Sequence, residues 1–246
     1  MKFEELLGFG TGLLIAPAAA LGSRLRGGRV VHKEGVVYRA DVRAVSHEDG
    51  LAGLGQRVAG PAIMRLSSAL WGVRREGWPD ILGASIRLRR DATITPEAAP
   101  DDQDMLFATI PYAALTGAAM FTTEVHSFLW DDYYALGLFE TPELGITQWR
   151  LASPRIPPGT SDRVSEVGKA IANGLAVFEL QVREKHLGAP YRTVAAVELQ
   201  ERVDVDQEAL RFSPFRNGRK IEARGFLNAT RIAPYAASQA ARPEHR

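Results

Sequence analysis

The chain contains no cysteine, which removes disulfide bonds and thiolate metal sites from consideration. Any metal must therefore be held by oxygen or nitrogen ligands or arrive inside a cofactor. Net charge is also nearly absent, at +1 over 246 residues, so no global field draws the chain onto nucleic acid or an anionic membrane. We expect no nucleic-acid partner, and the missing cysteines are consistent with a reducing, cytoplasmic compartment.

A long uninterrupted apolar run is missing as well. The best candidate, "LLGFGTGLLIAPAAALG" at residues 6–22, is broken by glycine and proline and follows Glu4 and Glu5, where a secretory signal carries positive charge. We interpret it as a packed helix and turn and expect no stable membrane insertion. The small residues of "APAAALG" are typical of a cleavage site, so a cleaved signal peptide and export remain the alternative.

The composition is that of a globular protein, with 46% apolar and 24% charged residues. All-β barrels and sandwiches of roughly 200–250 residues are common single domains, so we predict one domain over residues 1–246. Short apolar segments punctuated by Gly, Pro and Asp predict seven strands, within residues 35–45, 60–73, 80–90, 104–112, 144–156, 176–186 and 191–203. This rhythm favours an antiparallel barrel.

Helices are predicted in fewer places. "SDRVSEVGKAIANGL" at 161–175 repeats apolar residues every three or four positions, with Ser161 as the expected N-cap, and a second helical pattern lies near the C-terminus. "GFGTG" and "GLAGLG" superficially resemble dinucleotide-binding loops. Neither follows a strand in a βαβ unit, so both are predicted to be turns.

The residues around His32 resemble a known family. "GRVVHKEG" at 28–35 is similar to the stretch of haem catalases in which a histidine sits over the distal face of the iron. "MRLSSALWG" at 64–72 and "DILGASIRL" at 80–88 are similar to the next two strands of that family, in the same order. "DMLFATIPYAALTGAAMF" at 104–121 keeps the family's interval between a proline and a phenylalanine, here Pro111 and Phe121.

The C-terminal "TRIAPYAASQAAR" at 230–242 completes the resemblance. Catalases bind the iron through a tyrosinate, with one arginine four residues before it and another seven residues after it, as Arg231, Tyr235 and Arg242 are spaced here. On a helix these positions share one stripe. A phenol has a reference pKa of about 10, so a phenolate ligand requires the iron's charge and a nearby cation.

The resemblance implies an α+β protein with a catalase-type, eight-stranded antiparallel β-barrel and flanking helices. It implies one haem b, ligated by Tyr235. It further implies His32 as the catalytic base held by Ser67, with Phe121 stacked on the porphyrin. Arg29, Arg65 and Arg242 are the implied partners of the haem propionates, and Arg231 faces the phenol oxygen.

The implied activity is a peroxidase that reduces hydrogen peroxide or organic hydroperoxides, using a small organic electron donor. Two alternatives stay open: a hydroperoxide-rearranging enzyme of the allene oxide synthase type, and a non-enzymatic haem-binding barrel. The arm that interlocks catalase tetramers is missing, which favours a monomer or homodimer.

Some positions depart from the family. Ala108 and Thr109 replace two asparagines, the first of which helps to hold peroxide, so we expect weak catalase activity beside peroxidase turnover. Gln239 stands where many catalases have histidine. Pro234 disfavours a helix unless it lies in the first turn, which predicts Thr230 as N-cap.

One further candidate site lies outside the resemblance. His126 precedes "WDDYY", and a histidine with Asp131 and Asp132 could hold a metal, but the spacing matches no defined ligand motif. We interpret this segment as an amphipathic surface element.

Overall fold

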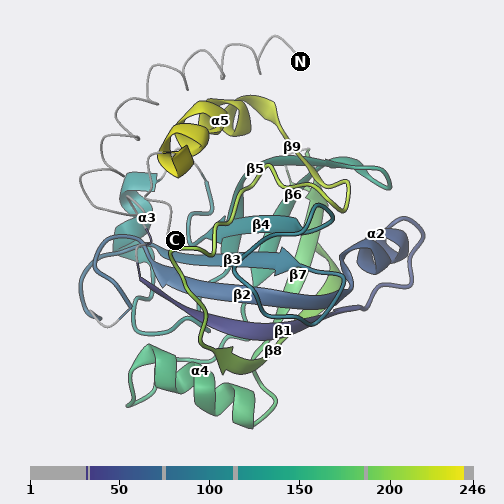
Figure 1. Cartoon of the computed structure of the whole chain (residues 1–246). Helices are drawn as coiled ribbons and strands as arrows, with labels where there is room; N and C mark the ends of the chain where they lie inside the picture. The colour runs from purple at the N-terminus through teal and green to yellow at the C-terminus, as the bar shows by residue number, and fades with distance from the viewer. Residues whose placement is uncertain (1–31, 33, 74–75, 113–115, 186–187, 241–246) are drawn as a thin grey trace.

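Eight antiparallel strands form a closed barrel (Figure 1). The computed structural model describes residues 32, 34–73, 76–112, 116–185 and 188–240, with the backbone alone for 116 and 233–240. The barrel closes where β4 pairs with β5, and a short ninth strand extends β5. The strands are β1 Gly35–Ala44, β2 Gly60–Ser68, β3 Leu82–Leu88, β4 Gln103–Ala108, β5 Tyr133–Thr141, β6 Gly145–Ala152, β7 Val177–Glu184, β8 Arg192–Val203 and β9 Glu222–Arg224. The predicted α+β class and eight-stranded barrel are confirmed.

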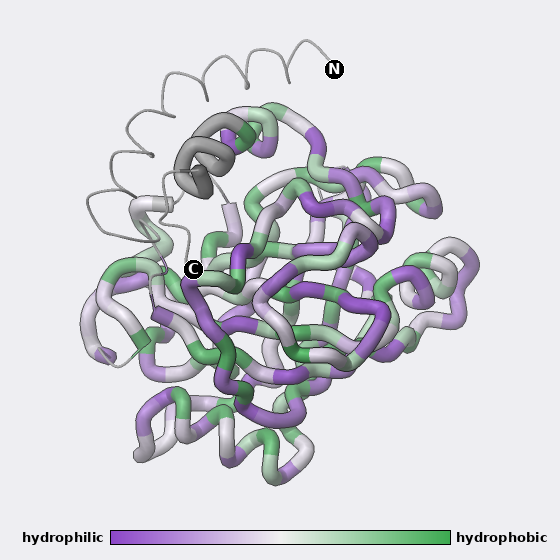
Figure 2. Tube along the Cα trace, viewed as in Figure 1, coloured by the Kyte–Doolittle hydropathy of each residue, from purple (hydrophilic) through white to green (hydrophobic). Residues whose placement is uncertain are grey.

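The inside of the barrel is filled with large side chains. Hydrophobic and polar residues alternate along the strands (Figure 2), and the core includes the fully buried rings of Tyr38, Trp149 and Phe178. An eight-stranded barrel is just wide enough to be filled in this way. The inside of the barrel is therefore a packed core.

Four helices surround the barrel in the described part of the chain: α2 Leu51–Val58, α3 Thr116–Thr122, α4 Arg163–Ala172 and α5 Gly225–Ala240. The helix α5 lies outside the barrel beside β5 and β9 (Figure 1). Asn228 of α5 donates from Nδ2 to the Leu138 carbonyl at 2.8 Å. A Cβ on Gly137 would lie 2.4 Å from that nitrogen, so glycine permits this close approach. No helix among the described residues has the length and apolar character needed to cross a bilayer.

The predicted strands all form, but their ends and number differ from the sequence prediction. The strand β5 was missed because its pairing with β6 shifts register between Tyr134 and Leu138, which breaks the period-two pattern. The strand β2 ends at Ser68, earlier than predicted. The buried carboxylate of Asp80 accepts from the backbone N–H of Leu70 and Trp71, which turns the chain there.

Three local predictions were wrong. Asp162, and not Ser161, caps α4, because its carboxylate accepts from two N–H groups of the first turn. The "GLAGLG" segment lies largely in the helix α2, where a Cβ on Gly55 would lie 2.6 Å from the Val194 carbonyl. The last helix begins at Gly225, so Thr230 lies inside it and donates to the Phe226 carbonyl at 2.9 Å. Pro234 therefore lies in the interior of α5 and not in the first turn that the sequence had predicted.

A buried ion cluster attaches the connecting segment 204–221 to the outer face of the barrel. Asp104 of β4 binds Arg87 of β3 at 2.8 Å and also pairs with Arg216 of the segment. The backbone N–H of Ser213 donates to the same carboxylate at 2.8 Å. Leu210 and Phe212 of the segment pack on Val37 and Ile63, outside the main core. The segment is therefore fixed across β1 to β4.

We expect Asp104→Ala to destabilise the protein strongly. The Arg87 side chain is fully buried, and breaking a buried pair by removing one partner costs about 3–5 kcal/mol. Asp101→Ala is the matched control, because Asp101 pairs with Arg90, whose side chain is 80% exposed, and exposed pairs contribute about 0–1 kcal/mol. Denaturant unfolding of both variants measures the difference. Equal free energies of unfolding would show that the cluster does not hold the segment.

Candidate functional site

A row of small residues crosses the outer face of the barrel. Gly35 of β1 pairs with Ser67 of β2, Ser67 with Gly83 of β3, and Gly83 with Ala108 of β4. Directly paired residues of neighbouring strands share one face of a sheet. The row leaves space on the barrel wall where longer side chains would stand.

The imidazole of His32 occupies part of this space. Its Nδ1 lies 3.0 Å from Ser67 Oγ. A Cβ on Gly83 would fall 2.5 Å from His32 Cε1, so the ring lies directly against the Gly83 backbone. The structure therefore brings together His32 and Ser67, as predicted, and adds Gly83, which the sequence analysis did not single out.

The backbone of His32 is held from two sides. Its N–H donates to the Ala69 carbonyl at 3.0 Å, and its carbonyl accepts from Arg65 Nη2 at 2.9 Å. Its φ of 56° lies in the left-handed region, which side chains other than glycine seldom adopt. These contacts explain how an unfavourable backbone conformation is retained next to β1.

We expect Gly83→Ala to displace the His32 ring. A methyl group at 2.5 Å from Cε1 overlaps the ring, and overpacking of this kind costs about 1–3 kcal/mol. The His32 ring signals in an NMR spectrum should shift, and the free energy of unfolding should fall. Gly168→Ala is the control, because a Cβ there meets no atom within 4 Å. If both variants leave the His32 signals unchanged, the contact between His32 and Gly83 is wrong.

The hydrogen bonds of Ser67 are compatible with a His32 tautomer that leaves the lone pair on Nε2. Ser67 Oγ also lies 3.3 Å from the Gly83 carbonyl, which can only accept a hydrogen. A hydroxyl has one hydrogen to donate. When it goes to Gly83, His32 must donate from Nδ1 to Ser67, and Nε2 then carries the lone pair. This arrangement suits a general base.

Arg65 lies beside this pair and is only 2% exposed. Besides its bond to His32, it donates from Nε to Gln207 Oε1 at 3.1 Å. The guanidinium rests on Gly35, where a Cβ would lie 2.4 Å from Cζ. The predicted propionate partner thus contacts the backbone of the predicted base.

The remaining predicted residues are placed in part. Phe121 lies on α3 with its side chain 72% exposed. Arg231 and Tyr235 both lie on α5, one turn apart, as their spacing predicts. The side chain of Tyr235 lies outside the described part of the structure, as do Arg29 and Arg242.

The two positions that replace asparagine differ in their surroundings. Ala108 ends the row of small residues and packs with Ile110 and with Ala119 of α3. Thr109 Oγ1 accepts from the N–H of Leu82 at 3.1 Å and shares a hydrogen bond with Thr123 Oγ1 at 2.9 Å. Thr109 therefore joins β3 to the end of α3.

The possible metal site near His126 does not assemble. His126 Nδ1 lies 3.9 Å from Glu76, while Asp131 accepts from the Glu124 N–H at 2.6 Å. Burial raises the pKa of the Asp131 carboxyl. Asp132 instead pairs with Arg150 and Arg155. Among the residues described, no His, Asp and Glu side chains gather in a group of three that could hold a metal ion.

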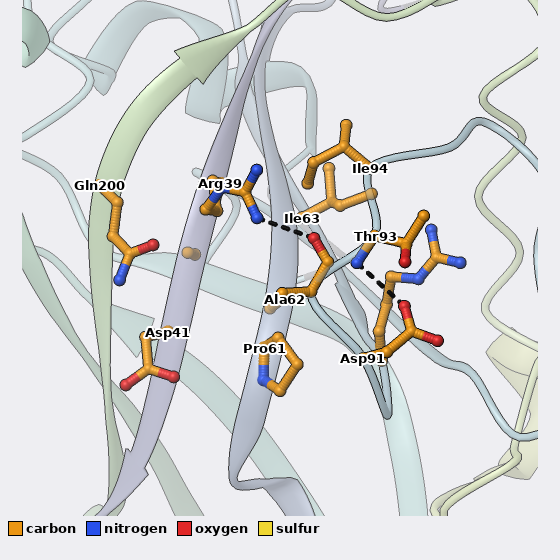
Figure 3. Close-up of a pocket in the computed structure, with 12 residues that line it drawn as sticks. Arg39, Asp41, Pro61, Ala62, Ile63, Asp91, Thr93, Ile94 and Gln200 are labelled. Atoms are coloured by element: carbon orange, nitrogen blue, oxygen red, sulfur yellow. Dashed lines mark hydrogen bonds between the residues drawn. The ribbon is translucent and has the colours of Figure 1, made fainter.

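A separate pocket of about 180 Å³ opens on the outer face, between β1, β2, the end of β8 and the loop after β3. Asp41 and Asp91 lie on either side of Pro61, and Arg39 reaches across to the Ala92 carbonyl at 2.7 Å (Figure 3). Asp41 is six residues along β1 from Gly35, about 20 Å in an extended strand. The pocket is therefore distinct from the His32 site.

Comparison of the chain with protein-family models and with curated proteins gives no match. The functional interpretation therefore depends on the geometry around His32. Three of the residues that build it were missed in the sequence: Gly35 and Gly83, which are indistinguishable from turn glycines without their neighbours, and Gln207, which is distant in the chain.

Proposed function

We propose that the chain is a catalase-type haem protein that reduces hydroperoxides. One observation carries the proposal: the His32 ring lies against Gly83, with its Nδ1 3.0 Å from Ser67 Oγ. A base whose ring is held at one nitrogen by a hydroxyl suits the transfer of a proton to and from a peroxide.

The residues fit haem in two respects. Beside His32, the row of small residues Gly35, Ser67, Gly83 and Ala108 lies on the outer face of the barrel. The helix that carries Tyr235 is anchored to β5, which is the strand next to β4. Both the base and the expected ligand therefore belong to elements on the outside of the barrel.

The residues that would hold the group follow from this arrangement. Tyr235 would ligate the iron, with Arg231 one helical turn away to favour the phenolate. Phe121 would stack on the porphyrin, and Arg29 and Arg242 would pair with propionates. Arg65 would add charge at the same edge, although its bonds to His32 and Gln207 give it a role in holding the base. Bound haem would supply the two-electron redox chemistry of O–O cleavage.

The protein's own side chains would transfer the proton of the hydroperoxide. His32 Nε2 takes the proton from the attacking hydroperoxide and returns it to the departing oxygen, which leaves as water or an alcohol. Ser67 keeps the ring in the tautomer that permits this. Over one turnover the hydroperoxide would take up two electrons and two protons from the organic donor and yield two products, water together with the alcohol, or two waters from hydrogen peroxide.

Peroxidase activity should exceed oxygen evolution from hydrogen peroxide. Disproportionation needs a second peroxide held between two polar groups. Ala108 offers no hydrogen bond at the position beside Gly83, and the hydroxyl of Thr109 is engaged by Leu82 and Thr123. We therefore expect clear turnover with small aromatic donors and weak catalase activity.

The test is reconstitution of the purified full chain with haem, followed by absorbance spectroscopy. We expect a high-spin ferric spectrum at one haem per chain, a spectral change on adding hydroperoxide, and oxidation of an aromatic donor. Product analysis separates reduction to the alcohol from rearrangement, which consumes no donor. Haem binding without any response to hydroperoxide would indicate a non-enzymatic barrel, and no binding would refute the proposal.

A further inference from the structure

Three distant parts of the chain meet at the backbone of His32. Gln207, in the segment 204–221, accepts from Arg65 Nε at 3.1 Å and donates from Nε2 to the Gly35 carbonyl at 2.7 Å. The same Arg65 side chain also contacts His32, because its Nη2 donates to the His32 carbonyl at 2.9 Å. Gln207 is thus joined to His32 through a single side chain.

The guanidinium of Arg65 has a site built for it. A Cβ on Gly35 would lie 2.4 to 2.6 Å from the Cζ, Nε and Nη2 atoms, so glycine alone lets Arg65 lie on the β1 backbone. The guanidinium is planar and rigid, and it donates in fixed directions. When Gln207 fixes Nε, the direction of Nη2 toward His32 is fixed as well.

His32 depends on such support more than an ordinary residue. At a φ of 56° its backbone adopts a conformation that is rare for side chains other than glycine, and such conformations persist only where the surroundings determine them. The Ala69 carbonyl fixes its N–H, and Ser67 fixes its ring. Arg65 fixes the remaining polar group of its backbone.

We propose that Gln207 is a positioning residue that sets the imidazole of His32 through Arg65. The segment 204–221 is itself attached to the barrel by Asp104 and leads into β9 and α5. One continuous stretch of chain therefore contacts Arg65, which binds the backbone of the base, and continues into the helix that is expected to carry the iron ligand. The proposed function is needed only for the catalytic readout.

The test is Gln207→Leu in the purified full chain, which removes both polar contacts with little change in volume. The ring nitrogen NMR signals of His32 report its tautomer without any need for haem. We expect the wild type to carry hydrogen at Nδ1, and the variant to show a mixture of tautomers and a shifted His32 amide signal. In the haem-loaded protein, the maximal rate of hydroperoxide cleavage should fall about ten- to a hundredfold, as small misplacements of catalytic groups do, with little change in KM.

Gln200→Leu is the matched control, since Gln200 lies on β8 at the pocket near Arg39 and not at the His32 site. A second route to the same result is Gly35→Ala, which should displace the guanidinium. If Gln207→Leu does not fold, Gln207→Asn keeps the amide but shortens its reach. Unchanged His32 signals in a folded Gln207 variant and in Gly35→Ala would overturn the proposal. Altered signals in a chain that binds no haem would uphold it while refuting the proposed function.

Discussion

Tyr235→Phe is expected to abolish haem binding or weaken it at least a hundredfold. The change removes one oxygen and keeps the ring, so α5 and its packing on β5 through Asn228 should be retained. No cysteine exists to replace the ligand, and His32 is held on the barrel wall by Ser67. Absorbance titration with haem measures the affinity directly.

Tyr112→Phe serves as the control, because Tyr112 is 58% exposed in the loop that precedes α3. It should bind haem as the wild type does. A Tyr235→Phe protein with unchanged affinity and spectrum would remove Tyr235 as the ligand and, with it, the proposed catalase-type arrangement.

His32→Ala should bind haem normally but cleave hydroperoxide about a hundredfold to ten-thousandfold more slowly, the usual contribution of a positioned general acid–base. The affected step is the transfer of the peroxide proton to Nε2 and its return to the leaving oxygen. Stopped-flow measurement of the spectral change on mixing with hydroperoxide gives the rate.

The backbone conformation of His32 calls for a second variant. Alanine is strained at a φ of 56°, whereas asparagine is enriched in that region. His32→Asn should therefore keep the local backbone and lose the base. His126→Ala, at a half-exposed histidine paired weakly with Glu76, is the control. If both His32 variants react as fast as the wild type, His32 does not act as the base.

The barrel was largely predictable because its signals are local. Alternation of apolar and polar residues is dictated by the two-residue repeat of a strand, and it located seven of the strands before any contact was known. The strand β5 escaped because a register shift interrupts that repeat between Tyr134 and Leu138. The cap of α4 was misplaced by one residue, since two neighbouring residues, Ser161 and Asp162, could both serve and only the geometry chose the carboxylate.

The sequence predicted the residues of the site that carry reactive or charged side chains, but not the glycines that make room for them. The pairing of His32 with Ser67 was inferred from a resemblance, and the hydrogen bond between them is present. Arg65 was expected to bind a propionate, which stays a prediction, and the structure adds its contacts with the His32 carbonyl and Gln207. A sequence cannot reveal that a guanidinium points along the barrel wall, because the space it fills exists only through the missing Cβ of Gly35.

The sequence by itself determined the alternating strands and the placement of Arg231 and Tyr235 one turn apart, because these depend on the fixed periods of strand and helix. The tertiary structure decided which glycines make room and which make turns. It also decided that Gln207 contacts Arg65 from 142 positions away and that Asn228 of α5 binds the Leu138 carbonyl of β5. Those contacts form between segments remote in the chain, where only the closed barrel sets the distances between side chains.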